Sequence, residues 1–287
     1  MTTGNDRPRL AEQFRAMHAD ATLVLPNAWD ALSAALIARA GAPAIATTSA
    51  AVSWALGRGD GQQLSRAEMV EQVRRIADAV TVPVSADIEG GYGPSAEEVV
   101  DTVAAVIEAG AVGVNLEDSR TGGGPLFEIA EQSARIRAAR AAAEGNGLPR
   151  LVINARTDVY LFGIGAPEDR FDEVVARAHA YAEAGADSLF VPGLLDLDVL
   201  RELTGKTPLP VNVMVGAGAP AVAEAGAPAV AELAAVGVRR ISFGPAVAQA
   251  AYARVAAVAA EALGAGTYSA LADGLDFGVV QALFTRE

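Results

Sequence analysis

The sequence predicts an α/β protein that forms a closed (β/α)8 TIM barrel. Short apolar runs rich in β-branched residues alternate with longer segments of helical period along the 287 residues, which is typical of βα units and a parallel sheet. Eight such runs occur with no linker between them, so a single barrel domain spanning residues 1–287 explains the count. An open doubly wound sheet is the alternative, but no G-x-G-x-x-G motif follows the first run.

The strands and the residues that precede them follow a regular order. The eight predicted strands are Thr22–Leu25, Ala44–Thr47, Val82–Asp87, Val112–Glu117, Leu151–Arg156, Ser188–Val191, Leu209–Met214 and Arg239–Phe243. Strands two, four, six and eight follow a glycine that is expected to end the preceding helix with a positive φ. These glycines are Gly41, Gly110, Gly185 and Gly237. Strands three, five and seven follow or contain a proline near their start, where its missing N–H is tolerated.

Helical segments complete the predicted barrel, whose core covers about residues 20–263. Apolar residues recur at helical spacing between the strands, as in Met69, Val73 and Ile76. An additional amphipathic helix is predicted around Arg9–Ala19, ahead of the first strand. A C-terminal tail, residues 264–287, is rich in large apolar side chains, and we expect it to cover either the barrel bottom or a neighbouring subunit. Those side chains are Tyr268, Leu271, Phe277, Leu283 and Phe284.

Composition excludes several classes of function. There are 22 Lys and Arg against 35 Asp and Glu, a net charge of −13, and such a surface repels nucleic acid. The chain has no Cys and two His, so thiolate catalysis, a zinc site and a Ser-His triad are not expected. The first residues are polar, and charged residues interrupt the apolar run Pro245–Leu263. We therefore expect no signal peptide, no membrane span and a cytoplasmic protein.

Polar residues cluster where the predicted strands end, which is where barrels of this kind carry their chemistry. Asp87 and Glu89 are two residues apart, so they point the same way if the third strand persists. The other strand ends carry Asn27, Ser49, Asn115, Glu117, Asn154, Arg156, Asp158, Asn212 and Ser242.

Carboxylates that converge at one end of a barrel repel one another and need protons or a cation. Oxygen ligands without His or Cys favour Mg²⁺ or Mn²⁺. The alternative is a structural network without metal, in which Arg156 pairs with Glu117 and Asp158. The single lysine, Lys206, precedes the seventh strand at the opposite end of the barrel, which excludes a Schiff-base mechanism.

Several segments, in this order, resemble the isocitrate lyase/phosphoenolpyruvate mutase superfamily. They are LPNAWDALSA, TTSA, ALGRGDG, VPVSADIEGGYG, GAVGVNLEDS and INARTD, and the likeness covers about Phe14 to Gly244. It is closest to the short, mutase-like branch, which has D-I-E where other members have D-A-D. The resemblance implies an N-terminal helix before the barrel and an eighth helix exchanged between the subunits of a dimer or tetramer. It also implies Mg²⁺ at the barrel mouth and 2-oxo acid substrates, or their precursors, whose cleavage leaves an enolate.

The resemblance also implies which residues hold the metal. Asp87 matches the direct Mg²⁺ ligand of the superfamily. Glu89, Glu117 and Asp60 match residues that hold the ion mainly through water molecules.

The substrate residues are implied in the same way. Ser49 and the backbone of Ala50 and Ala51 match the cradle for the substrate carboxylate. Arg156 matches the arginine that grips substrate oxygens, and its planar, permanently charged guanidinium suits that role. Asn212 is a further candidate for substrate binding. A metal-bound 2-oxo acid would be cleaved by Lewis-acid stabilisation of the enolate oxygen.

The loop after the fourth strand, SRTGGGPLFE, departs from the superfamily pattern. It lacks the catalytic Cys of isocitrate and methylisocitrate lyases and the Asn of phosphonate-forming mutases. Its glycines, Gly122, Gly123 and Gly124, are compatible with a mobile lid or with an irregular surface loop.

The leading hypothesis is a Mg²⁺-dependent lyase or decarboxylase that acts on a small 2-oxo or 2-hydroxy dicarboxylate. Tyr92, Glu117 or a metal-bound water could transfer the proton. Two alternatives stay open: a phosphoenolpyruvate or carboxyphosphonoenolpyruvate mutase, and an inactive barrel that binds a metabolite.

Overall fold

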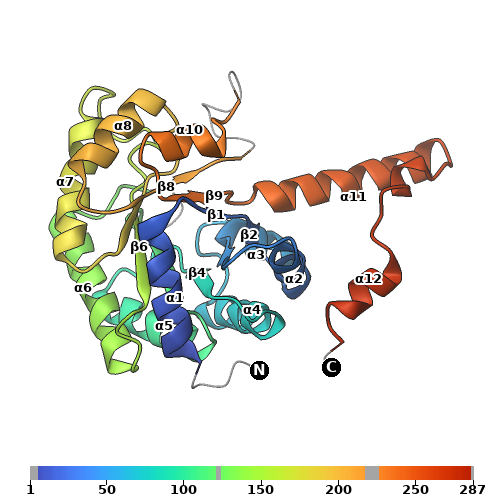
Figure 1. Ribbon diagram of the computed structural model, residues 1–287, viewed down its shortest axis with the longest axis horizontal. Coiled ribbons are helices and arrows are strands. Elements are labelled where there is room, and N and C mark those ends of the chain that lie inside the picture. Colours follow the sequence, from blue (N-terminus) through green and yellow to red (C-terminus); the bar gives the residue numbers. More distant parts are fainter. Residues whose placement is uncertain (1–5, 121–123, 217–225, 286–287) are drawn as a thin grey trace.

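The computed structural model describes residues 6–120, 124–216 and 226–285, and these form a closed parallel barrel surrounded by helices (Figure 1). All nine strands belong to one sheet in the order β1-β9-β8-β7-β6-β5-β4-β3-β2. The first two, β1 (Leu23–Leu25) and β2 (Asn27–Ala28), are halves of one barrel strand interrupted at Pro26. Because β1 pairs with β9 and β2 pairs with β3, the barrel closes with eight strand positions, which confirms the predicted fold.

The remaining strands lie within the predicted runs. They are β3 (Ile45–Thr47), β4 (Val84–Asp87), β5 (Gly113–Glu117), β6 (Val152–Arg156), β7 (Ser188–Phe190), β8 (Val211–Met214) and β9 (Arg240–Ser242). The four glycines predicted to end helices have φ between 88° and 107°, as that role requires.

Most of the helices cover the outside of the barrel, and the first confirms the additional N-terminal helix. They are α1 (Arg7–Asp20), α2 (Ala31–Arg39), α3 (Ser49–Ala55), α4 (Arg66–Ala79), α5 (Ala96–Glu108), α6 (Ile129–Gly145), α7 (Arg170–Glu183), α8 (Leu197–Lys206), α10 (Val230–Ala235), α11 (Ala246–Gly264), the 3-10 turn η1 (Ser269–Leu271) and α12 (Phe277–Ala282). Ser65 and Ser95 begin α4 and α5 with capping boxes, which satisfy backbone N–H groups of the first turn.

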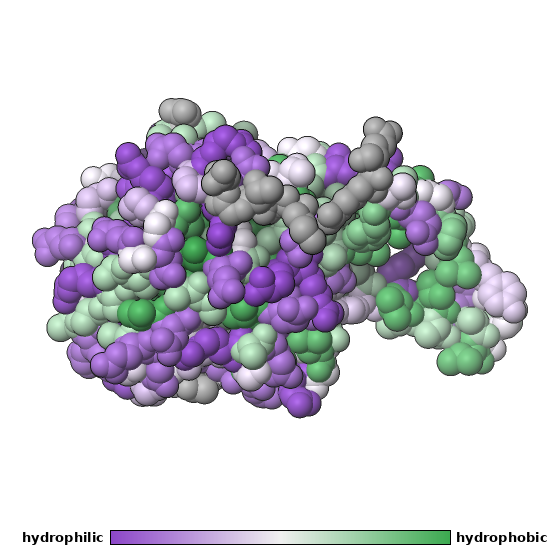
Figure 2. All heavy atoms as spheres, turned by 90° about the horizontal axis from the view of Figure 1, so that it is seen from below, coloured by the Kyte–Doolittle hydropathy of each residue, from purple (hydrophilic) through white to green (hydrophobic). Residues whose placement is uncertain are grey.

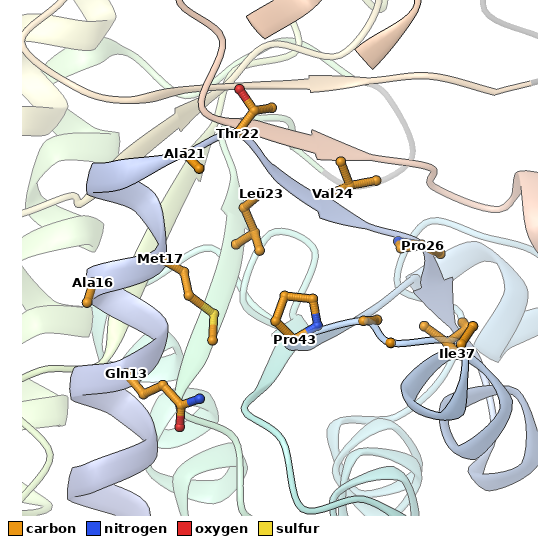
Figure 3. A pocket seen from close by; sticks show the side chains of 13 residues that line it. Gln13, Ala16, Met17, Ala21, Thr22, Leu23, Val24, Pro26, Ile37 and Pro43 are labelled. Carbon is orange, nitrogen blue, oxygen red and sulfur yellow. The ribbon is translucent and has the colours of Figure 1, made fainter. Parts of the chain in front are cut away.

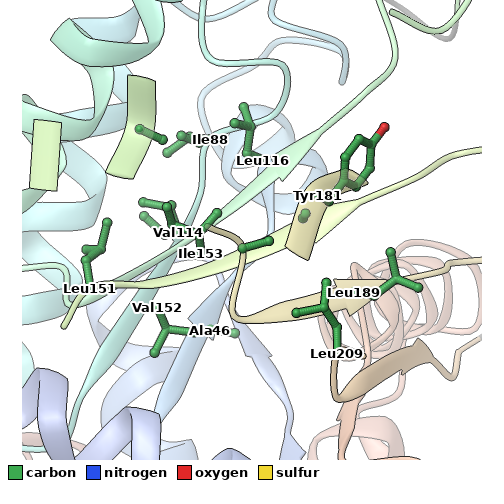
Figure 4. Packing of buried hydrophobic residues seen from close by; sticks show 14 of the residues in the cluster. Ala46, Ile88, Val114, Leu116, Leu151, Val152, Ile153, Tyr181, Leu189 and Leu209 are labelled. Carbon is green, nitrogen blue, oxygen red and sulfur yellow. The ribbon is translucent and has the colours of Figure 1, made fainter. Parts of the chain in front are cut away.

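The hydrophobic core lies between the barrel and the helices. On β5, Val114 and Leu116 are fully buried against the helices, as is Ile153 on β6 (Figure 4). Side chains alternate along a strand, so Asn115 and Asn154 face the barrel interior. Apolar burial outside the barrel therefore stabilises the fold, while the interior is left free for polar side chains.

The last long helix, α11, does not return to the barrel but projects away from it (Figure 1). Val255 is 65% exposed and Leu263 is 90% exposed, and Phe277 in the tail is 76% exposed. Hydrophobic side chains accordingly gather on this projecting arm (Figure 2). The tail packs on α11 through η1 and leaves most of its apolar side chains exposed, so of the two predicted locations it does not take the bottom of its own barrel.

The sequence predicted that the apolar run Pro245–Leu263 falls short of a membrane span. In length and composition this prediction was wrong. Among the described residues, α11 is the one helix that is long and apolar enough to cross a membrane. That criterion does not distinguish a membrane span from a helix that packs against another protein chain. Contact with a second subunit is the alternative explanation for the exposed apolar side chains of α11.

The turn at Gly110 provides a test of the fold. Its φ is 107°, and a Cβ atom there would lie 2.9 Å from the Cβ of Ala77. We expect Gly110→Ala to lower the free energy of unfolding by about 1–3 kcal/mol. Urea denaturation measures this change.

The matched control is Gly145→Ala at the end of α6. A Cβ atom there meets nothing within 4 Å and the backbone φ is not left-handed. We expect this variant to keep or slightly raise stability. Equal losses in the two variants would contradict the account.

Candidate active site

A cavity of about 200 Å³ opens at the carboxyl ends of the strands. Five of the predicted site residues line it: Ser49, Ala50, Asp60, Asp87 and Arg156. The other predicted residues are not among its lining: Ala51, Glu89, Tyr92, Glu117 and Asn212. The cavity therefore lies at the predicted end of the barrel, and half of the predicted site residues line it.

Asp87 is held in place by hydrogen bonds from two neighbouring elements. The backbone N–H of Ser49, at the start of α3, donates to Oδ2 over 3.0 Å. The amide of Asn115 on β5 donates to Oδ1 over 3.0 Å. The backbone N–H of Asp87 in turn donates to Oγ1 of Thr47 over 2.8 Å. These bonds fix the orientation of the carboxylate.

The hydrogen bonds continue from Asn115 across the barrel interior. Asn154 on β6 donates to Oδ1 of Asn115 over 3.0 Å, and Ser188 on β7 donates to Oδ1 of Asn154 over 2.6 Å. A side-chain relay thus runs over four adjacent strands and orients the amide that holds Asp87. Such outer partners set the geometry of the group at the centre of a site.

Glu89 does not share a strand face with Asp87, because β4 ends at Asp87. Its φ is 48°, and Gln62 and Tyr92 also have positive φ values of 57° and 59°. The buried carboxylate of Glu89 accepts hydrogen bonds from the backbone N–H of Gln62 and from the Tyr92 hydroxyl, the latter over 3.1 Å. Left-handed conformations of non-glycine residues are strained and concentrate at functional sites.

Three acids at the site lack a cationic partner. Among the described residues, Asp87, Glu89 and Asp60 make no ion pair. Burial and the charge of Asp87 raise the pKa of Glu89 to about 7. Partial desolvation and the same charge raise the pKa of Asp60. The mouth of the cavity therefore carries acidic groups without an ion pair, and the nearby charges of Arg156 and Arg240 act on Asp87 only at longer range.

Arg156 forms the ion pairs that the metal-free alternative predicts. Nη1 lies 2.8 Å from Oε2 of Glu117, and Nε lies 2.6 Å from Oδ1 of Asp158. Burial alone would lower the pKa of Arg156, but these two carboxylates raise it above its usual value. The network pairs both Glu117 and Asp158 with one guanidinium, and it leaves the three other acids without an ion pair.

A second buried ion pair supports Asp158 from behind. The backbone N–H of Asp158 donates to Oδ1 of Asp118 over 3.0 Å. Oδ2 of Asp118 accepts from Arg177 over 3.0 Å and from the Tyr181 hydroxyl over 2.8 Å. Sequence reasoning missed this support, because Asp118 and Arg177 are far apart in the chain and no local pattern links them.

The site fits a cation that keeps most of its water. No three His, Asp or Glu side chains among the described residues come close enough together to surround one ion. Mg²⁺ commonly binds through one or two carboxylates and retains several waters. Asp87 could bind such an ion directly, with Glu89 and Asp60 reached through water, because their negative charge is unbalanced.

Two candidates outside the cavity lining make hydrogen bonds within the protein. Tyr92 donates its hydroxyl proton to Glu89, and burial together with the charge of Glu89 raises its pKa. Asn212 is fully buried, and its Oδ1 accepts from the hydroxyl of Ser242 over 3.0 Å. The hypothesis of a lid at Gly122–Gly124 falls largely on residues 121–123, which lie outside the described part.

Arg240 also lines the cavity and was missed from the sequence. It lies two residues before Ser242, so both face the barrel interior. The alternation that placed Ser242 at a strand end would have found it.

Comparisons with known proteins show which family the sequence resembles. A family model described as phosphoenolpyruvate phosphomutase matches residues 14–263. An oxaloacetate decarboxylase of Bradyrhizobium sp. (strain BTAi1) is 35% identical over 175 residues, which cover 60% of this chain and 57% of the relative.

Two solved structures show the same fold. A protein of Burkholderia cenocepacia J2315, assigned provisionally as a phosphonomutase, is 46% identical with a TM-score of 0.80 and covers 88% of this chain and 99% of its own. An oxaloacetate acetylhydrolase in complex with oxalate is 25% identical with a TM-score of 0.84 and covers 96% of this chain and 94% of its own. The similar proteins thus include both lyase-type and mutase-type enzymes.

The pKa of Glu89 makes cation binding dependent on pH. Below about pH 7 this carboxyl group is protonated and neutral, so Mg²⁺ binding must release its proton. We expect the affinity for Mg²⁺ to fall as the pH drops below about 7, by up to about tenfold per pH unit. Isothermal titration in buffers of different ionisation enthalpy measures both the affinity and the released protons. Glu89→Gln removes the titrating group and should flatten the profile, and an equally steep profile in this variant would contradict the assignment.

Proposed function

Because the chain belongs to the phosphoenolpyruvate phosphomutase family of the isocitrate lyase/phosphoenolpyruvate mutase superfamily, we propose that it is a Mg²⁺-dependent lyase or decarboxylase. Its substrate would be a small 2-oxo or 2-hydroxy dicarboxylic acid whose C–C bond is cleaved. The observation that carries this proposal is a group of three acids without an ion pair: Asp87 and Asp60 line the cavity that Arg156 also lines, and the N–H of Glu89 donates to Asp87. An inactive metabolite-binding barrel would have no need to maintain this strained, charged arrangement.

The start of α3 is suited to hold a carboxylate of the substrate. The first turn of a helix leaves backbone N–H groups without helical acceptors. The N–H of Ser49 already donates to Asp87, so the groups of Ala50 and Ala51 are the ones available to a ligand.

Arg156 would bind the remaining negative charge of the substrate. Its ion pairs with Glu117 and Asp158 hold the guanidinium plane in one orientation, which avoids an ordering cost when the ligand arrives. A bound Mg²⁺ (or Mn²⁺) would supply Lewis-acid stabilisation of negative charge on the substrate oxygens.

Glu117 is better placed than Tyr92 to move a proton. Burial raises the pKa of Glu117 well above its usual value, although Arg156 opposes the shift. The hydroxyl of Tyr92 is committed to Glu89 and its pKa is raised. We therefore assign proton transfer to Glu117 or to a water molecule, and we assign Tyr92 to the positioning of Glu89.

Mutase chemistry is the second candidate, favoured by the 46% identity to the protein from Burkholderia cenocepacia. Against it, the loop SRTGGGPLFE has no Asn. Phosphorus NMR of the protein with phosphonopyruvate and Mg²⁺ separates the two functions, because only a mutase converts the P–C bond to a P–O bond.

The lyase function is tested with oxaloacetate. We expect turnover that depends on Mg²⁺ and that a chelator abolishes. We also expect Asp87→Ala to lower kcat/KM by about 100-fold or more, because it removes the proposed direct ligand of the cation that stabilises negative charge in the transition state. Pyruvate release above the rate of the Mg²⁺-only reaction measures it. The control is Asp198→Ala, on the exposed start of α8. Turnover that survives the chelator or Asp87→Ala would contradict the proposal.

We also propose that the protein is a homo-oligomer in which α11 is exchanged. A hollow of about 800 Å³ lies beside β1, between α1 and α2, and is lined mainly by apolar side chains such as Met17, Leu23, Ile37 and Pro43 (Figure 3). In a (β/α)8 barrel, the helix after the last strand packs against the outer ring near the first strand. Since α11 projects away instead, the same helix of a second subunit would fill the hollow. Such a dimer or tetramer buries α11 without a membrane, in keeping with a soluble cytoplasmic enzyme.

Light scattering after size-exclusion chromatography tests the assembly. We expect the wild type to be a dimer or tetramer, and we expect the double variant Val255→Asp with Leu263→Asp to dissociate, because buried carboxylates without partners are costly. Val230→Asp, on the exposed surface of α10, is the control. A monomeric wild type, or a double variant that assembles as well as the control, would contradict the exchange.

A further inference from the structure

Arg240 is a buried cation for which the protein supplies no acceptor. The residue is 3% exposed and lies on β9 inside the barrel. Among the described residues it forms no hydrogen bond and no ion pair, and Nε and Nη1 are both buried without a partner. Its one aromatic neighbour is Phe14, whose ring centroid is 5.8 Å from Cζ. Burying a charge without a partner is unfavourable, so a missing ligand is the simplest explanation.

Two other polar groups without partners lie near Arg240. Asn212 pairs with Arg240 in the β8–β9 register, and its Nδ2 is buried without an acceptor. The hydroxyl of Ser85 on β4 is also buried without a partner. Ser85 and Arg240 both line the cavity that contains Asp87. Arg240 and Ser85 therefore present a guanidinium and a hydroxyl to the floor of this cavity, and the amide of Asn212, which pairs with Arg240 in the sheet, is a third donor without an acceptor.

Charge is divided between the two ends of the cavity. Asp60 and Asp87 make the mouth acidic, and Arg156 forms its ion pairs with Glu117 and Asp158 and not with these two acids. Arg240 makes the floor basic. Burial lowers the pKa of Arg240 to about 10, and Asp87 opposes the shift, so Arg240 stays positively charged at neutral pH.

We propose that Arg240, Asn212 and Ser85 form an anion subsite on the floor of the cavity, and that it takes the second carboxylate of the substrate. A carboxylate matches the planar fork of a guanidinium and can accept further hydrogen bonds from an amide and a hydroxyl. This assignment rests on the proposed function for the position of the first carboxylate. It makes the cavity selective for dicarboxylates over monocarboxylates, because a monocarboxylate would leave the hydrogen-bond donors of the floor without acceptors.

Malate and lactate test the assignment, because malate is lactate with one additional carboxylate. Both are titrated with Mg²⁺ into the wild type and into Arg240→Met, which keeps most of the side-chain volume. We expect Arg240→Met to weaken malate binding about tenfold or more and to change lactate binding less than about twofold. Arg239→Met is the matched control, since it removes the neighbouring arginine, which precedes β9 and does not line the cavity.

A second measurement needs neither a metal nor a variant. Wild-type crystals grown without Mg²⁺ in sodium bromide should show anomalous density for bromide at the Arg240 guanidinium. Bromide at this place together with absent binding of both acids would support the subsite and contradict the proposed function. No bromide at the floor, with malate binding unchanged in Arg240→Met, would overturn the subsite. Bromide at the floor with equal losses for malate and lactate would overturn the assignment to the substrate and indicate a free anion.

Discussion

The orientation of Asp87 is the constraint on which the rest of the site depends. Its carboxylate receives the backbone N–H of Ser49 and the amide of Asn115, and Asn115 is itself held by Asn154. These bonds exist because the inward positions of β5 and β6 are polar, whereas barrels of this type usually fill their interior with branched apolar side chains. The unfavourable burial of these polar groups is offset because the apolar residues of the same strands face outward and pack on the helices.

Charge is distributed so that some groups are balanced within the chain and others are not. Arg156 forms ion pairs with Glu117 and Asp158, and Arg177 forms one with Asp118. The acids at the mouth and the arginine at the floor have no such partners. Since unpaired buried charge is costly, the simplest account is that ligands complete both ends: a hydrated cation at the mouth and a carboxylate at the floor. A molecule that joins these two chemistries is a small dicarboxylic acid bound to a divalent metal.

The periodic features of the fold could be predicted from the sequence. The runs of β-branched residues located every barrel strand, and Gly110 and its counterparts end helices because only glycine adopts their φ without strain. Alternation along the strands also placed Asp87, Asn115 and Arg156 in one cavity. Backbone turns were less predictable. Glu89 leaves the strand direction through a left-handed conformation, which cannot be predicted from a glutamate in the sequence.

Long-range effects were the least accessible from the sequence. The course of α11 is decided by where its apolar face finds a partner, and the composition of the helix is equally compatible with packing on its own barrel. Tyr92 reads as a candidate acid in the motif GGYG, and only the position of Glu89 shows that its proton is engaged. Arg240 lies in the predicted strand, but its lack of partners is a property of the whole barrel interior.

A crystal structure of the protein with Mg²⁺ and oxalate tests the central claim most directly. The account predicts one Mg²⁺ bonded to an oxygen of Asp87, with water molecules linking it to Glu89 and Asp60, and oxalate between this ion, the start of α3 and Arg156. A cation bound at Glu117 or Asp158 in place of Arg156, or a cavity that holds oxalate without a metal at Asp87, would contradict it.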